Sequence, residues 1–346
     1  MLVALVATSA QAEQPVAPKQ KFYQLESTLP MKSNGNSWDY LTLDPDTSYL
    51  YIGRRKEGVT VVNTATNKVV AELQNAEDAN GVTLIKDMDL GYTSNEDGSM
   101  TMFNISTLKT VKRIKVGEDG DSSVYEPVTK RIFFLQGDSK TIVALDARTG
   151  EKVSELKTQS SKLEAPVADG KGNIFMPFRD KNVVVRLDAR EMKLTAQWPT
   201  TGCTDPTGLA WDKDGKRLFV GCRGKNPVLL VMDSDNGKVI ASQEIGRGVD
   251  KVIYDKDTKK IYTANGVDAT LVIIDQIDAN TYKLSEALGT RPGARTMDMD
   301  PKTKKIFMVT AEGTQDQNKK VNRGPGYFYP NTFFPNTFVL LTYSSR

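Results

Sequence analysis

The amino-acid sequence predicts an all-β fold, a seven-bladed β-propeller with four-stranded antiparallel blades. Three observations lead to this prediction: one strand–turn–strand unit recurs seven times, its spacing is close to 43 residues, and no helix of ten or more residues is indicated. Propeller blades show such a period, because each repeat supplies the four strands of one blade. The period favours a single ring over a division of the 346 residues into two α/β domains.

Each unit consists of an alternating apolar strand, an acidic turn and a second strand rich in aromatic and β-branched residues. The acidic turn residues are Asp44, Asp87, Glu126, Asp169, Asp212, Asp255 and Asp300, at intervals of 39 to 45 residues. Two further strands follow each unit, and the turn between them has hairpin composition, as in residues 63–68 (NTATNK). Because carboxylates bond the backbone in tight turns, we interpret the acids as structural rather than as calcium ligands.

The two ends of the repeat array complement each other. The last unit lacks an obvious fourth strand, whereas residues 21–31 (KFYQLESTLPM) form an extra strand before the first unit. We expect this N-terminal strand to complete the last blade, because closure of the ring covers an otherwise open sheet edge. Residues 21–346 then form a single propeller.

The N-terminus has the pattern of an export signal. A short apolar run at residues 2–7 is followed by Ala10-Gln11-Ala12, an Ala-x-Ala sequence typical of a signal-peptide cleavage site. We interpret residues 1–12 as a signal peptide remnant and residues 13–20 as a disordered leader. These features predict a periplasmic or secreted bacterial protein. No later stretch approaches the roughly 18 apolar residues of a membrane span.

Three segments resemble the YVTN-repeat β-propellers, the YncE-like family of bacterial exported proteins. They are residues 218–224 (LFVGCRG), 246–266 and 291–313, and the resemblance extends over roughly residues 35–345. It implies the seven-bladed fold, and for one branch of the family it implies DNA binding. Many relatives carry a histidine just before the strand that begins here at Val82. In this chain that stretch reads Asp78-Ala79-Asn80-Gly81, so no histidine-dependent role carries over.

The absence of histidine restricts the possible chemistry. A sequence without histidine excludes Ser-His-Asp and Cys-His nucleophile systems as well as histidine-ligated metals and haem. We predict no catalytic residue, no metal site and no cofactor. The 46 basic and 43 acidic residues leave a net charge of +3, which is too small to predict nucleic-acid binding.

Cys203 and Cys222 are the only cysteines. Cys203 precedes one predicted strand and Cys222 ends the next, so antiparallel pairing places them side by side. An oxidising compartment favours a structural disulfide, and a redox-active pair or a soft-metal site is the alternative.

Blade topology brings two kinds of loop to one face of the ring: the loop that enters the innermost strand and the loop that leaves the second strand. Residues that enter the inner strands include Trp38, Asn80, Asp121, Glu164, Asp205, Asp250 and Arg295. Residues that leave the second strands include Arg54, Arg55, Asn95, Gln136, Arg179, Arg223, Asn265 and Glu312, and Arg247 lies just upstream of Asp250.

From this set we predict a ligand site at the mouth of the channel, formed by Arg54, Arg179, Arg223, Arg247, Arg295, Asp250, Asn80 and Trp38. Arginine binds carboxylates and phosphates with two parallel hydrogen bonds, which favours a small anionic or polar ligand. Alternatively, these arginines pair with aspartates of neighbouring blades.

The final unit contains a long insert, residues 313–336, which should emerge on the same face. Its aromatic residues are candidates for a lid or a docking patch for a protein partner: Tyr327, Phe328, Tyr329, Phe333 and Phe334. The alternative is that these rings pack against the outside of the blade.

Three functional classes follow from these features. We favour a monomeric periplasmic propeller that binds a small ligand or a protein partner through the arginine-rich mouth and the aromatic loop. A metal-dependent lactonase-like hydrolase or a quinoprotein-related enzyme is the alternative, supported by fold analogy. A metal cluster of Glu164, Asp205 and Asp250 would favour it. Nucleic-acid binding is a second alternative, and it requires a continuous basic stripe.

Overall fold

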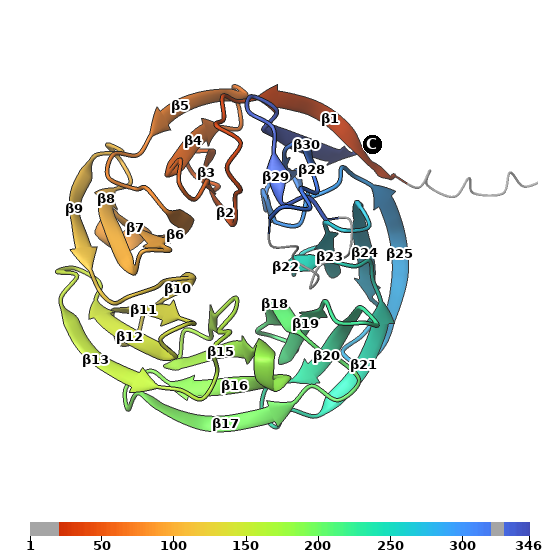
Figure 1. Ribbon diagram of the computed structural model, residues 1–346. Coiled ribbons are helices and arrows are strands. Elements are labelled where there is room, and N and C mark those ends of the chain that lie inside the picture. Colours follow the sequence, from red (N-terminus) through yellow and green to blue (C-terminus); the bar gives the residue numbers. More distant parts are fainter. Residues whose placement is uncertain (1–20, 320–328) are drawn as a thin grey trace, which may run out of the picture.

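The computed structural model describes residues 21–319 and 329–346. They form seven four-stranded antiparallel sheets around a central axis (Figure 1). The predicted seven-bladed propeller is therefore confirmed. The predicted signal peptide and leader, residues 1–20, lie outside the described residues.

Each blade runs from an inner strand near the axis to an outer strand at the circumference. The innermost strands are β2 (Leu41–Asp44), β6 (Ala79–Ile85), β10 (Ser122–Glu126), β14 (Val167–Ala168), β18 (Pro206–Asp212), β22 (Val249–Asp255) and β26 (Met297–Met299). The second strands are β3 (Tyr49–Gly53), β7 (Leu90–Asn95), β11 (Arg131–Gln136), β15 (Asn173–Phe178), β19 (Arg217–Cys222), β23 (Lys260–Asn265) and β27 (Ile306–Thr310).

The outer half of each blade follows the same order. The third strands are β4 (Val59–Asn63), β8 (Ser99–Asn104), β12 (Thr141–Asp146), β16 (Val183–Asp188), β20 (Val228–Asp233), β24 (Thr270–Gln276) and β30 (Val339–Ser345). The outermost strands are β5 (Lys68–Glu72), β9 (Thr110–Lys115), β13 (Lys152–Lys157), β17 (Lys193–Pro199), β21 (Val239–Glu244), β25 (Tyr282–Gly289) and β1 (Tyr23–Pro30).

The N-terminal strand closes the ring as predicted. β1 is the outer strand of the seventh sheet, whose order is β1-β30-β27-β26. Its register with β30 runs from Tyr23 opposite Ser345 to Pro30 opposite Val339. Because β1 pairs with β30, both ends of the chain are hydrogen-bonded within the same blade. This pairing holds the first and the last strand of the repeat array together.

The acidic turns lie between the inner and second strands, on the side of the ring that we call the turn face. In six blades the acid accepts a hydrogen bond from the backbone N–H two residues later; the acids are Asp44, Glu126, Asp169, Asp212, Asp255 and Asp300. The structural interpretation of these acids is therefore confirmed. In the second blade a 3-10 turn, η1 (Lys86–Met88), takes this place and contains Asp87.

The hydrophobic core lies between adjacent blades rather than in one central mass. For example, Phe175 and Val184 of the fourth blade form one buried cluster with Leu218 and Val220 of the fifth. Strand residues alternate between the two faces of a sheet, so every inner blade face contributes apolar side chains to one of two neighbouring clusters. Such packing fixes the angle between blades and thereby the width of the channel.

Cys203 and Cys222 form a disulfide with a Cα–Cα distance of 5.6 Å. Pro206 of β18 lies opposite Cys222 of β19, which brings the segment before β18 against the end of β19. Both half-cystines are buried, with exposed fractions of 3% and 0%. The predicted disulfide is present.

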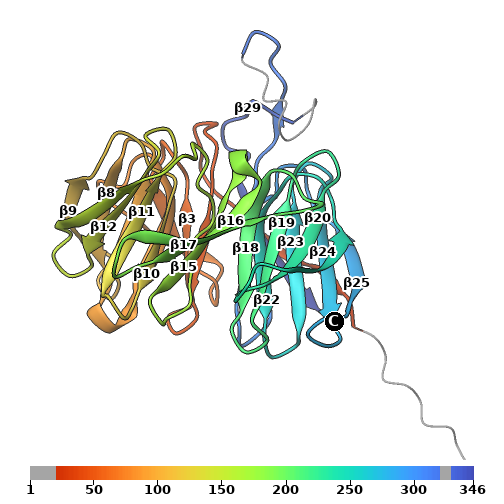
Figure 2. The ribbon, with the colours of Figure 1, turned by 90° about the horizontal axis from the view of Figure 1, so that it is seen from below.

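The insert of the seventh blade stands above the ring on the side opposite the turn face (Figure 2). Its base is a two-stranded ribbon of β28 (Gly313–Thr314) and β29 (Thr332–Phe333). The described helices are η1 and η2 (Arg179–Lys181), each a single 3-10 turn, and no helix in residues 21–319 and 329–346 has the length and apolar character needed to cross a membrane.

Candidate ligand-binding site

A polar cavity of about 630 Å³ opens at the axis on the side away from the acidic turns, which we call the mouth face. Its walls come from the segments that enter inner strands and the segments that leave second strands, so blade topology brings together residues far apart in the sequence. Its charged lining residues are Asp39, Arg55, Glu96, Asp119, Asp121, Asp138, Lys162, Glu164, Arg179, Arg223, Asp250 and Arg295.

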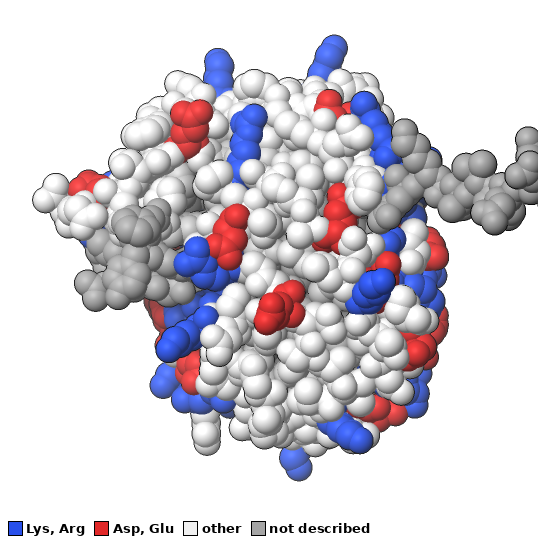
Figure 3. All heavy atoms as spheres, turned by 90° about the vertical axis from the view of Figure 1, so that its right-hand side faces the viewer, with Lys and Arg blue, Asp and Glu red and all other residues white. Residues whose placement is uncertain are grey.

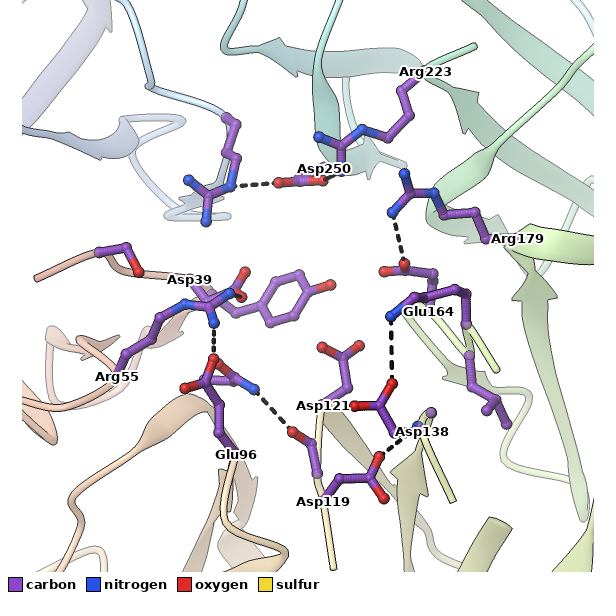
Figure 4. Close-up of a pocket in the computed structure, with 18 of the residues that line it drawn as sticks. Asp39, Arg55, Glu96, Asp119, Asp121, Asp138, Glu164, Arg179, Arg223 and Asp250 are labelled. Atoms are coloured by element: carbon purple, nitrogen blue, oxygen red, sulfur yellow. Dashed lines mark hydrogen bonds and ion pairs between the residues drawn. The ribbon is translucent and has the colours of Figure 1, made fainter. Parts of the chain in front are cut away.

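Charged pairs between neighbouring segments surround the cavity (Figure 4). Asp250 bridges two arginines: one of its oxygens pairs with Arg223 and the other lies 2.5 Å from Nε of Arg295. Arg179 lies 3.4 Å from both Glu164 and Asp205. The contacts of Asp250 and Asp205 are the inter-blade pairs that the sequence left open as the alternative, whereas Glu164 and Arg179 belong to the same blade.

The remaining two cations of the lining are also paired. Arg55 contacts Asp39 at 2.5 Å and also pairs with Glu96, and Lys162 lies 3.6 Å from Asp138. All five cationic side chains of the cavity therefore already have a carboxylate partner, and an anionic ligand would have to compete with these carboxylates for the guanidinium groups.

Five of the eight residues predicted for the mouth line the cavity: Arg179, Arg223, Arg295, Asp250 and Asn80. Asn80 is only 2% exposed, and its position is set by close contacts between blades. Its backbone oxygen accepts a hydrogen bond from Tyr40 N at 2.8 Å. A side chain at Gly53 would collide with the same oxygen, so only glycine permits this approach.

The other three predicted mouth residues do not reach the cavity. Arg54 is buried under Phe338, 4.6 Å from the ring centroid, and its guanidinium bonds Glu57 and the carbonyl of Lys32. Burial lowers the pKa of Arg54, although the Glu57 charge opposes this shift. Its role is to attach the N-terminal segment to the first blade.

Arg247 and Trp38 are held elsewhere by local contacts. The Arg247 side chain is 59% exposed and pairs with Asp268, whose carboxylate also accepts the Arg247 backbone N–H at 2.7 Å. Trp38 is fully buried, with its ring centroid 4.8 Å from that of Phe333. It supports the site indirectly, because its carbonyl accepts a hydrogen bond from Arg295 at 2.6 Å.

The aromatic insert contributes two of its five predicted residues to the cavity. Tyr329 lines it and its hydroxyl bonds Arg295 at 3.0 Å, while Phe333 lines it and packs on Trp38. Phe334 is 44% exposed and lies outside the lining. Tyr327 and Phe328 lie outside the described residues.

Several lining residues were not in the predicted site. Arg55, Asp121 and Glu164 belong to the loops that the topology singled out. The prediction took Arg54 rather than its neighbour, left Asp121 out of the ligand site and considered Glu164 only for a metal cluster. Tyr40 lines both the cavity and a second pocket of about 110 Å³ beneath it, between inner strands. Its position one residue before β2 was the available signal.

The electrostatics of the acids differ around the cavity. Burial raises the pKa of Asp121 well above its usual value, and the nearby charges of Glu164 and Asp39 raise it further. Burial also raises the pKa of Glu164, to about 7, against the opposing effect of Arg179. Carboxyls with raised pKa values in a cavity are frequent at functional sites.

Some of the buried polar atoms without partners lie in the cavity wall. Among the described residues, buried side-chain atoms that lack a hydrogen bond include Oδ2 of Asp121, Oδ1 of Asn80 and Nε of Arg223, all of which line the cavity. Buried polar groups normally have partners, so such atoms mark a place that a ligand or water completes. No group of three or more potential metal ligands is found within residues 21–319 and 329–346.

Comparisons with known proteins show the fold. No protein-family model matches the chain, and no curated protein sequence matches it. A chain from a crystal structure of the mitotic checkpoint complex is similar, with a TM-score of 0.72 at 15% identity over 89% of this chain and 95% of that chain. So is a chain of hydrazine synthase from Kuenenia stuttgartiensis, with a TM-score of 0.69 at 18% identity over 80% and 94%.

Proposed function

We propose that this protein is an exported β-propeller that binds a small polar ligand in the mouth cavity. The observation that carries the proposal is a cavity of about 630 Å³ whose cationic groups are already held in ion pairs while buried polar atoms on its wall lack partners. A site held in its binding geometry before the ligand arrives loses less entropy on binding. The blades supply that rigidity, because each lining residue lies at or near the end of a strand.

The insert adds to this proposal. Tyr329 and Phe333 add aromatic side chains to the cavity wall, and the Tyr329 hydroxyl accepts a hydrogen bond from the Arg295 guanidinium. Aromatic surface combined with a few placed polar groups is typical of small-molecule sites. We also propose that residues 1–12 direct export, which the disulfide supports, and that the chain belongs to the YVTN-repeat propellers, which the seven-bladed fold supports.

The two alternative functions have less support. Nucleic-acid binding requires a continuous basic surface, whereas basic and acidic side chains are interspersed on the side of the ring shown in Figure 3. For enzymatic hydrolysis, the sequence suggested a metal cluster of Glu164, Asp205 and Asp250. Two of these acids contact Arg179 and the third bridges Arg223 and Arg295, so each of the three already contacts a guanidinium group.

Native mass spectrometry of the exported protein tests the proposal. We expect a co-purifying small molecule on the wild-type protein and its loss from Arg223→Ala, because this substitution removes part of the cavity wall. Arg247→Ala is the matched control, since Arg247 pairs with Asp268 outside the cavity. If both variants retain the molecule, or if the wild-type protein carries none and binds no polar probe, the cavity is not the binding site.

A further inference from the structure

The acidic and basic side chains of the cavity do not balance in number. Seven carboxyl groups and five cationic side chains line it, so acidic groups are in excess. Each cation is paired, and the acids that take part are Asp39, Glu96, Asp138, Glu164 and Asp250. The excess therefore resides on Asp119 and Asp121, two residues of the segment that enters β10.

These two acids have different surroundings. Asp119 accepts hydrogen bonds from the backbone N–H groups of Asp138 and Ser139, at 2.7 and 3.1 Å, and so stabilises a turn. Asp121 pairs with none of the cavity's cations, and its buried Oδ2 has no hydrogen-bond partner in the described part of the chain. Figure 4 shows its carboxylate directed into the open centre of the ring. Asp121 is thus the acid left for a ligand.

Asn80 supplies a second, independent acceptor beside it. The amide nitrogen of Asn80 donates to the carbonyl of Gly120, at 3.0 Å, and Gly120 directly precedes Asp121. A carbonyl only accepts hydrogen bonds, so this contact fixes the orientation of the amide and leaves Oδ1 as the free atom. Asn80 is 2% exposed and lines the cavity, yet Oδ1 has no partner among the described residues.

Tyr40 lies next to this pair. Its backbone N–H donates to Asn80 O at 2.8 Å, and its side chain lines the cavity. Burial raises the pKa of the Tyr40 hydroxyl, and the largest charge contribution comes from Asp121, so the phenol remains neutral near this carboxylate. Its hydroxyl oxygen is a third acceptor, and its ring offers a π-face that attracts cations.

We propose that the ligand of this cavity carries a protonated amine, whose ammonium group binds Asp121, Asn80 and Tyr40. This inference rests on the proposed binding function and specifies its ligand class. An ammonium group has three N–H donors, and this corner of the cavity offers a carboxylate, an amide oxygen and a phenol oxygen. A positive ligand also offsets the excess of carboxylates, whereas an anionic ligand would increase it.

A divalent metal ion fits this corner less well than an ammonium group. Calcium takes six to eight oxygen ligands and usually several carboxylates. Here Asp119 is bonded to backbone N–H groups and the other carboxylates of the wall are engaged by arginine or lysine, so each would have to leave its partner to reach the ion. An organic cation needs only the free acceptors.

Isothermal titration calorimetry with three probes of equal chain length tests the inference. The probes are 1,5-diaminopentane, 1,5-pentanediol and glutarate, which differ in charge, and calcium chloride is titrated separately. We expect the diamine to bind most tightly. Asp121→Asn keeps the shape of the side chain and removes its charge, and should weaken diamine binding roughly 10- to 100-fold, the range of a lost charged hydrogen bond.

Two variants complete the experiment. Asp268→Asn removes a carboxylate from the mouth face outside the cavity and should leave diamine affinity unchanged. Tyr40→Phe retains the ring and should cause a smaller loss than Asp121→Asn. Circular dichroism confirms that each variant is folded, and any variant that does not fold is replaced by a competition titration of the wild-type protein.

The possible outcomes separate the two proposals. Tighter binding of glutarate than of the diamine, calcium binding that depends on Asp121, or unchanged diamine affinity in Asp121→Asn would each overturn the amine inference. In the first case, loss of glutarate binding in Arg223→Ala would still support the cavity as a binding site. If no probe binds and native mass spectrometry shows no retained molecule, both proposals fail.

Discussion

The two faces of the ring use the same residue types for opposite purposes. On the turn face, Asp44 bonds the backbone of its own turn and pairs with Lys86 of the next blade at 2.6 Å. Although burial acts to raise it, the pKa of Asp44 is lowered overall, because Lys86, a backbone N–H and Thr47 all bond the carboxylate. On the mouth face, Asp121 has no such partners and its pKa is raised.

This contrast separates stability from binding. A carboxylate whose hydrogen bonds are all made within the protein favours folding, whereas a buried carboxylate without partners disfavours it. The repeat keeps the first kind in register from blade to blade. The second kind occurs where the loops differ between blades, and natural proteins often retain such unfavourable groups where a ligand binds.

The largest effect that we expect comes from the disulfide, which strengthens the mouth side of the fifth blade. Replacing Cys203 and Cys222 together by serine should lower the free energy of unfolding by about 3 kcal/mol, the usual size for a loop of this length. Because Arg223 follows Cys222 directly, ligand affinity should fall as well. Chemical denaturation measures the first change and calorimetry the second.

Hydrogen exchange then distinguishes a local effect from a global one. Amides at the end of β19 near Cys222 should exchange faster in the double variant, while amides at its start near Arg217 should change less. Equal acceleration at both ends would contradict the assignment of the disulfide to the mouth side.

A smaller effect is expected from Asp255→Ala on the turn face. Asp255 is 4% exposed and accepts hydrogen bonds from Asp257 N at 3.2 Å, from Thr258 at 2.6 Å and from Lys304 of the seventh blade at 2.8 Å. Their loss should cost about 2 kcal/mol of unfolding free energy. Thermal and chemical denaturation measure this loss.

Ligand affinity serves as the comparison for this variant. Asp255 lies on the face opposite the cavity, so the folded Asp255→Ala protein should bind ligand as well as the wild-type protein does. A marked loss of affinity without unfolding would show that the two faces are coupled. The turn-face acids would then contribute to binding as well as to stability.

The architecture could be predicted from the sequence because propeller blades repeat. The acidic turns recur with the blade period, and hairpin turns and strand alternation leave few other arrangements for 43 residues. The disulfide followed from strand pairing together with the expected oxidising compartment. Ring closure by β1 followed from the missing strand in the last unit. Both could be predicted because the repeat fixes which strands pair in each blade.

The site was only partly predictable, because its residues lie in the loops where the blades differ. Topology correctly brought Arg179, Arg223 and Arg295 to the cavity. It could not decide between Arg54 and Arg55, since neighbouring residues at a strand end point in different directions and packing against Phe338 decides which is buried. That Asp121 lacks a partner is a property of the assembled ring, in which other acids take the available cations.

The smallest effect concerns the pH dependence of stability, and it compares the faces directly. Burial raises the pKa of Glu164 from 4.5 to about 7. The native protein therefore holds this proton more tightly than the unfolded chain does, and the contribution of Glu164 to stability declines as pH rises from about 4.5 to about 7. Asp44, with its lowered pKa, has the opposite sign: its contribution is lost as pH falls below the usual aspartate range.

Denaturation curves of the ligand-free protein between about pH 2 and pH 8 measure both contributions, because that of Asp44 changes only below its usual pKa of 3.8. Glu164→Gln removes a titrating carboxyl, so the variant should lose less stability than the wild-type protein as pH rises from 4.5 to about 7. Asp44→Asn should be less stable than the wild-type protein near neutral pH, and this difference in unfolding free energy should shrink as pH falls. If Glu164→Gln leaves the pH profile unchanged, Glu164 is already ionised in the empty cavity, and the electrostatic difference between the faces is limited to Asp121 and its immediate neighbours.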